Sequence, residues 1–254
     1  DPRQEKIDLG VGVYKDAHGN TPIMRSIKKA ESHLWKTEST KTYTSMTGDS
    51  GFHNAMADLV LADSVDRDRL SFCATPGGTG AIHHVLELVK LTGSNPKIWF
   101  SDPTWGNHLT IAKHLKMTVG KYSYFNNETR AVNFEAMVSD LSKISNGDIV
   151  VLHGCCHNPT GANLNNEQWN IIADLLLEKD AIPFIDIAYQ GFGEGIEEDA
   201  FGTRLLASKF PEMFIAASCS KNFGIYRERC GIVITVSKNP DISSITQGNL
   251  SYVN

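Results

Sequence analysis

One lysine in this chain has the setting of a reactive amine. Lys221 stands in the stretch 218–224 (SCSKNFG), directly after an apolar run with the composition of a buried strand. Partial burial lowers the pKa of a lysine amine and makes it a nucleophile able to form a Schiff base with a carbonyl. The alternative is an ordinary solvated surface lysine. Arg227 and Arg229 follow closely, and either can meet a phosphate.

A carboxylate lies inside another apolar run. Asp186 belongs to the stretch 183–189 (PFIDIAY), where a charge is costly unless it meets a cation or a hydrogen-bond donor. Asp186 is therefore either part of a binding site or a structural residue at a strand end. Tyr189, three residues on, can turn its hydroxyl into the same cleft.

A glycine-rich turn, residues 75–80 (TPGGTG), directly precedes the first clear helical pattern. Free N–H groups at a helix N-terminus bind anions, and glycines let the anion approach the backbone. The signal is weak by itself, because such turns are common loops. It also lacks the spacing of a P-loop or a dinucleotide fingerprint.

Two further motifs predict no chemistry of their own. The stretch 153–161 (HGCCHNPTG) has metal-ligand residue types, but adjacent cysteines at a strand end are expected to point in opposite directions. No metal site is predicted there. The stretch 48–51 (GDSG) resembles a serine-protease nucleophile, but that chemistry needs an all-β fold and a histidine context that the sequence lacks.

The elements that must position these residues alternate along the chain. Near-continuous apolar runs, typical of strands buried on both faces of a mainly parallel sheet, predict strands at 97–100, 148–153, 183–187, 213–218 and 232–236. Helical spacing of apolar residues predicts helices around 82–89, 134–141 and 169–176, with Gly93 as a stop and Asn165 with Gln168 as a capping box. The pattern indicates an α/β fold, in which ligands bind at the carboxyl ends of the strands.

Composition sets the wider limits. The 254 residues are 41% hydrophobic, and a chain of this length is expected to bury about 75% of its extended-chain surface without a disulfide or a structural metal. A net charge of −5 gives no electrostatic case for nucleic acid or for an anionic membrane. Five cysteines indicate reduced thiols. There is no apolar run of about 20 residues and no signal-peptide core at the start, so a cytoplasmic protein is expected.

Taken together, the motifs resemble one family. Their order and spacing over nearly the whole chain are similar to those of the pyridoxal-phosphate-dependent aspartate aminotransferases, at residues 8–15 (DLGVGVYK), 76–80, 103–108 (PTWGNH), 153–161, 186–192 (DIAYQGF) and 218–224. The resemblance implies the fold-type-I aminotransferase architecture, a mainly parallel sheet flanked by helices, in a homodimer. Residues 21–254 would form the cofactor-binding large domain, and residues 1–20 would belong to the small domain.

The resemblance also implies roles for single residues. Lys221 would bind pyridoxal 5′-phosphate covalently and then move a proton as a catalytic residue. Asp186 would pair with the pyridinium nitrogen, so that the ring acts as an electron sink. Asn158 and Tyr189 would hydrogen-bond the phenolic oxygen of the ring, and Trp105 would stack on it.

Further roles concern the phosphate, the substrate and the surroundings of the ring. The residues implied for the phosphate are Gly78, Thr79, Ser218, Ser220 and Arg229, with Tyr43 reaching it from the neighbouring subunit. Gly12 would donate its N–H to a substrate carboxylate, in a substrate site shared with Trp105 and Asn158. His108 would lie behind the ring near Asp186.

The implied reaction is a ping-pong transfer of the amino group between aspartate or glutamate and 2-oxoglutarate or oxaloacetate. The aspartate branch is preferred over the aromatic branch because Val13, Lys15, Thr21 and Thr79 resemble it, whereas Thr42 departs from the asparagine common there. An aromatic-amino-acid aminotransferase is the alternative.

The resemblance stops at the ends of the chain. Family members run much further than Asn254, and the arginines that bind the two substrate carboxylates have no counterpart in this sequence. The amino-terminal arm that braces the dimer has none either. A fragment is therefore expected, and a catalytically silent cofactor-binding fragment is the other alternative.

Overall fold

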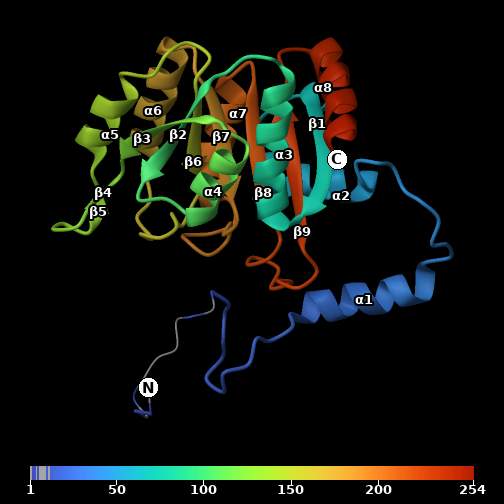
Figure 1. The fold of residues 1–254 in the computed structure, drawn as a ribbon. Helices are drawn as coiled ribbons and strands as arrows, with labels where there is room; N and C mark the ends of the chain where they lie inside the picture. The colour runs from blue at the N-terminus through green and yellow to red at the C-terminus, as the bar shows by residue number, and fades with distance from the viewer. Residues whose placement is uncertain (1, 4, 6–9, 11) are drawn as a thin grey trace.

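The core of the structure is a β-sheet with helices on both of its faces (Figure 1). The computed structural model describes residues 2, 3, 5, 10 and 12–254. Within these residues, the seven strands of the sheet are β1 (Leu70–Pro76), β2 (Lys97–Asp102), β3 (Thr118–Ser123), β6 (Ile149–His153), β7 (Ile182–Ile187), β8 (Met213–Ser218) and β9 (Cys230–Val236). A separate pair is formed by β4 (Phe125–Asn126) and β5 (Ala131–Val132).

The sheet is mainly parallel, as predicted. Its strand order is β1-β9-β8-β7-β6-β2-β3, and among the described strands of this sheet only β9 runs opposite to the rest. The carboxyl ends of the other strands therefore meet at one edge. Because β9 follows β8 through a short connection, its first residues lie at that same edge.

Helices cover the sheet in two layers. The described helices are α1 (Arg25–Thr37), α2 (Ser50–Leu61), α3 (Gly77–Leu91), α4 (Gly106–His114), α5 (Phe134–Leu141), α6 (Asn166–Glu178), α7 (Phe201–Lys209) and α8 (Pro240–Val253), with short 3₁₀ turns η1 (Arg67–Arg69) and η2 (Glu198–Ala200). Apolar side chains of α2, α5, α6 and α7 pack on one face of the sheet, and those of α3, α4 and α8 on the other. None of the helices in the described part has the length and apolarity needed to cross a membrane.

The predicted elements agree with the structure. All five predicted strands are present, with ends within two residues of the expected ones, and the three helical patterns fall in α3, α5 and α6. Asn165 and Gln168 form the expected capping box. Gly93 lies just beyond α3 with a φ of 69°, in the left-handed region that suits a helix stop.

Two local predictions need a different account. The glycine-rich turn does not precede the helix, because α3 already begins at Gly77 and so includes all three of its glycines. The stretch 48–51 caps a helix, since the carboxylate of Asp49 accepts a hydrogen bond from the backbone N–H of Phe52 over 3.0 Å at the start of α2. This capping role explains the Asp-Ser sequence without any nucleophile.

The first part of the chain lies apart from the layered body (Figure 1). Helix α1 has no buried residue, and Trp35 within it is 87% exposed. Asp16 closes a turn before Asn20, because its Oδ1 accepts hydrogen bonds from the N–H groups of His18 and Asn20. The assignment of residues 1–20 to a second domain stays a prediction. Asp8, Leu9 and Val11 of the first motif lie outside the described residues.

Candidate active site

A pocket lies at the sheet edge where the carboxyl ends of β7 and β8 meet the start of α3. It brings together most of the residues predicted as a site, namely Gly12, Gly78, Thr79, Trp105, Asn158, Asp186, Tyr189, Ser218, Ser220, Lys221 and Arg229. Tyr43 is fully exposed and does not line the pocket, as expected of a residue predicted to act on a neighbouring subunit. Its role stays a prediction.

Lys221 lies three residues beyond the end of β8 and lines the pocket. Its Nζ is 5.3 Å from the centre of the Tyr189 ring. Burial lowers the pKa of Lys221, with a smaller opposing effect from Asp186 and a further lowering by Arg229. At a given pH, a larger fraction of the Lys221 amine is therefore neutral and nucleophilic than in a solvated lysine.

Asp186 is held in place from behind by a histidine. It lies in β7, is 9% exposed, and its Oδ2 is 2.8 Å from Nε2 of His108, a fully buried residue of α4. Burial acts to raise the pKa of Asp186, but the hydrogen bond to His108 and the electrostatic effects of His108, His153 and Lys221 together hold the pKa below its ordinary value. The carboxylate is thus charged at neutral pH and faces the pocket.

The orientation of His108 is fixed on its other side. Its Nδ1 is 2.8 Å from the hydroxyl oxygen of Thr104. This contact and the hydrogen bond to Asp186 together fix the plane of the imidazole ring. Thr104, His108 and Asp186 therefore form one chain of hydrogen bonds that ends at the pocket.

Two further histidines extend this polar cluster, and sequence reasoning did not assign them. His153 lines the pocket, and its Nδ1 accepts a hydrogen bond from the backbone N–H of Asn158 over 3.3 Å. His157 lies between the hydroxyls of Ser101 and Thr160, each 2.9 Å from a ring nitrogen. Burial lowers the pKa of His153 to about 4 and that of His157 to about 3. Both are neutral at pH 7.

An anion cradle forms the other end of the pocket. Gly78 and Thr79 lie in the first turn of α3, where free N–H groups and the helix dipole favour a negative charge. Ser218, Ser220 and Arg229 line the same pocket. Arg227, the alternative to Arg229, does not line it.

The backbone of Gly77 comes unusually close to the guanidinium of Arg229. A Cβ added at Gly77 would lie 2.6 Å from Nη2 of Arg229, and one at Gly78 would lie 3.1 Å from Cβ of Ser218. Gly77 also has a φ of 73°, which disfavours any other residue. The guanidinium is held by the carbonyl of Tyr226 at 3.0 Å. The two glycines therefore let the guanidinium of Arg229 and the side chain of Ser218 lie directly against the start of α3.

Other residues complete the walls of the pocket. Trp105 precedes α4, and its ring meets that of His108 edge-on at 5.5 Å between centres. Burial raises the pKa of Tyr189, which follows β7, and the nearby Asp186 adds to the effect. Tyr226 also lines the pocket, unpredicted, and its hydroxyl oxygen accepts a hydrogen bond from the N–H of Tyr14 over 3.0 Å. That bond ties the segment after Gly12 to the site.

Comparison with known proteins decides the family. Residues 4–249 match the family model described as aminotransferase class I and II. The chain belongs to this family. It is 52% identical to the aromatic-amino-acid aminotransferase of Paracoccus denitrificans over 254 residues, and 41% identical to the aspartate aminotransferase of Haemophilus influenzae over 245 residues. These matches cover 100% and 95% of this chain but only 64% and 62% of the relatives, so the chain spans less than two thirds of their length.

Solved aminotransferase structures have the same fold. An aromatic amino acid aminotransferase with 3-indolebutyric acid superposes with a TM-score of 0.97 at 51% identity. The aromatic-amino-acid aminotransferase of Burkholderia pseudomallei, covalently bound to pyridoxal phosphate, gives 0.95 at 34%. That of Psychrobacter sp. B6, cocrystallised with aspartic acid, gives 0.94 at 34%. Each match covers 100% of this chain and 64% of the aminotransferase. The predicted aminotransferase fold is confirmed.

Proposed function

We propose that this protein is a pyridoxal-phosphate-dependent aminotransferase, which moves an amino group between an amino acid and a 2-oxo acid. The observation that carries the proposal is the pocket that holds Lys221, the charged Asp186 and the anion cradle together. Family membership and the pyridoxal phosphate bound to the Burkholderia pseudomallei aminotransferase support it.

The residues of the pocket fit the cofactor at three places. The start of α3, with the guanidinium of Arg229 held against Gly77, suits a phosphate group. The buried, ionised carboxylate of Asp186 suits a protonated ring nitrogen. The amine of Lys221, with its lowered pKa, suits an aldehyde carbon. Trp105, Asn158 and Tyr189 would line the faces and edge of the ring.

When bound, pyridoxal phosphate supplies an electron sink for negative charge at the α-carbon of the substrate. Asp186 would hold a proton at the ring nitrogen, because His108 keeps the carboxylate ionised despite its burial. The amine of Lys221 would accept the proton from the α-carbon and later return one, as a general base and acid. The N–H of Gly12 would orient the substrate through its carboxylate.

For the substrate, aspartate and glutamate are the first candidates. Val13, Lys15, Thr21 and Thr79 resemble the aspartate branch. Aromatic amino acids are the second candidate, favoured by the 52% identity to the Paracoccus denitrificans enzyme. The two candidates are compatible, since the Psychrobacter aromatic aminotransferase was cocrystallised with aspartic acid.

We infer a cytoplasmic homodimer as the working form. The full exposure of Tyr43 and the lack of any buried residue in α1 support a second subunit that covers this part of the chain. The five free cysteines are consistent with a reducing compartment.

A transamination assay tests the proposal. The protein is given pyridoxal phosphate, 2-oxoglutarate and either aspartate or phenylalanine, with Lys221→Ala as the matched control. We expect formation of the corresponding 2-oxo acid by the native protein and none by the variant, and the ratio of kcat/KM for the two amino acids separates the candidates. No turnover with either amino acid, or equal turnover in Lys221→Ala, would contradict the proposal.

A further inference from the structure

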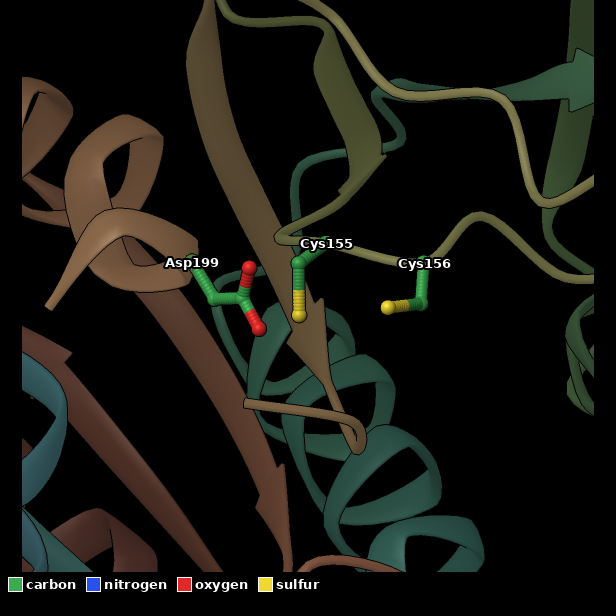
Figure 2. A group of neighbouring side chains, drawn as sticks. All are labelled: Cys155, Cys156 and Asp199. Carbon is green, nitrogen blue, oxygen red and sulfur yellow. The ribbon is translucent and has the colours of Figure 1, made fainter. Parts of the chain in front are cut away.

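A pair of adjacent thiols and a carboxylate meet beside the candidate active site, where Cys155 lines both the pocket of Lys221 and a second, neighbouring pocket. The Sγ atoms of Cys155 and Cys156 and a carboxylate oxygen of Asp199 all lie within 4.8 Å of one another. Figure 2 shows the thiol of Cys155 between the carboxylate of Asp199 and the thiol of Cys156. Cys155 and Asp199 are buried, and Cys156 is half-buried.

This arrangement corrects the expectation that adjacent cysteines point in opposite directions. Alternation of side chains holds only in extended backbone, and β6 ends at His153, before the cysteines. Cys156 has a φ of 47°, in the left-handed region that is uncommon for residues other than glycine. The turn brings the two thiols to one side of the chain, which is the geometry that a shared ligand requires.

The carboxylate of Asp199 is fixed but not saturated. Its Oδ2 accepts hydrogen bonds from the N–H groups of Gly191 and Gly193 at 2.8 and 2.9 Å, and its Oδ1 accepts one from Glu194 at 2.9 Å. A carboxylate offers about four acceptor positions, so one stays open on Oδ1. The side chain is thereby held where a cation can use it without a change of rotamer.

An acidic pocket leads to the group. Cys155 and Asp199 line it together with Glu167, Glu194 and Glu198. Among the described residues that line this pocket there is no lysine or arginine. A concave surface with carboxylates of one sign attracts cations and raises their local concentration.

We propose that Cys155, Cys156 and Asp199 bind one thiophilic divalent cation of the Zn²⁺ and Cd²⁺ type, with water in the fourth position. Two thiols lose their protons as two metal–sulfur bonds form, so each ion bound releases up to two protons. Metal–sulfur and metal–oxygen bonds of about 2.3 and 2.0 Å bring the ligand atoms of a tetrahedral site somewhat closer together than 4.8 Å. Small shifts of flexible side chains provide that closure. None of the three ligands has a role in the proposed transamination, although Cys155 also lines its pocket.

Cd²⁺ alone serves as the probe, in a reduced sample of the protein without pyridoxal phosphate. Equilibrium dialysis gives the stoichiometry and Kd, and the ultraviolet absorption of the cadmium–thiolate bond reports on sulfur ligation. The variants are Cys155→Ser, Cys156→Ser and Asp199→Asn. The matched control is the double variant Cys219→Ser and Cys230→Ser, which removes the other neighbouring pair of cysteines.

We expect one tightly bound ion per chain of the native protein. In each of the three variants the affinity for Cd²⁺ should be at least about tenfold lower, the size of loss found when a metal site is altered. The double variant should bind Cd²⁺ as tightly as the native protein. Because Cys155 is buried, its variant can fail to fold. The half-buried Cys156 then carries the test, together with slower alkylation of Cys156 in the native protein when Cd²⁺ is present. Unchanged binding in Cys156→Ser, or loss of binding only in the double variant, would overturn the proposal.

Discussion

His108 contacts Asp186 from inside the protein, over 2.8 Å between Nε2 and Oδ2, while the carboxylate faces the pocket. The histidine is completely buried and the side chain of Asp186 is 10% exposed. His108 thus stabilises the charge of the carboxylate on its buried side, while Asp186 lines the pocket that a ligand can enter. This relation makes the pocket suited to a protonated nitrogen heterocycle, and it is the basis of the first prediction.

Replacement of Asp186 removes that charge. In Asp186→Asn the shape is kept but no anion faces the ring nitrogen, and we expect turnover to fall by at least about 10²-fold, the size of effect seen when one preorganised electrostatic group is removed. Steady-state kinetics measure it. Asp174→Asn, at an exposed carboxylate paired with Lys209, is the control and should keep its turnover. Turnover of Asp186→Asn close to that of the native protein would show that the carboxylate does not pair with the cofactor.

The phosphate cradle predicts a difference between two arginines. Arg229→Lys replaces a planar fork of donors by a single ammonium, so we expect the affinity for pyridoxal phosphate to fall by about tenfold. Arg227→Lys keeps its affinity, because Arg227 lies outside the pocket. Spectroscopic titration of the cofactor-free protein gives both Kd values. Equal losses in the two variants would place the phosphate elsewhere.

The buried histidines predict acid sensitivity. His153 and His157 have pKa values of about 4 and about 3 in the folded protein, because burial disfavours their charged form, against about 6.5 when unfolded. Below pH 6.5 the unfolded chain therefore takes up protons that the folded chain cannot. The two histidines therefore do not reduce the free energy of unfolding above that pH. As the pH drops towards 4, the free energy of unfolding decreases by up to about 1.4 kcal/mol per pH unit for each histidine.

His157→Gln isolates one part of this effect. Urea unfolding at pH 7, 6 and 5 should give a pH dependence shallower by about 1.4 kcal/mol per unit in the variant between pH 6 and 5. His33→Gln, on the exposed helix α1, should keep the native slope. A slope that His157→Gln leaves unaltered would mean that the histidine is not buried neutral in the folded state.

Sequence reasoning predicted Lys221 and Asp186 for a physical reason. Each follows or ends an apolar run, and the ends of parallel strands meet at one edge of a sheet. Strand β1 was not predicted, because Ser71, Cys73 and Thr75 interrupt its apolar pattern although Ser71 and Cys73 are fully buried. The hydroxyl of Ser71 is satisfied by the carbonyl of Ser243 at 2.8 Å, a partner 172 residues away that no local pattern reveals.

The missed residues of the site lie at the end of a strand or in loops. His153 and Cys155 belong to the stretch 153–161, whose residue types were considered only for a metal site, which was rejected on the alternation of side chains in a strand. That alternation does not apply at Cys156, whose backbone is left-handed. Tyr226 reaches the pocket from the connection between β8 and β9, where neither period of apolar residues applies. Residue types and spacing alone left Arg227 and Arg229 as alternatives, whereas the family resemblance selected Arg229, the one of the two that lines the pocket.

The central claim is that Lys221 binds pyridoxal phosphate. The most direct measurement incubates the protein with the cofactor, reduces it with borohydride and maps the labelled peptide by mass spectrometry. The account predicts a phosphopyridoxyl group on Lys221 and none in Lys221→Ala. A label on any other lysine, or a native protein that acquires no label at saturating cofactor, would contradict it.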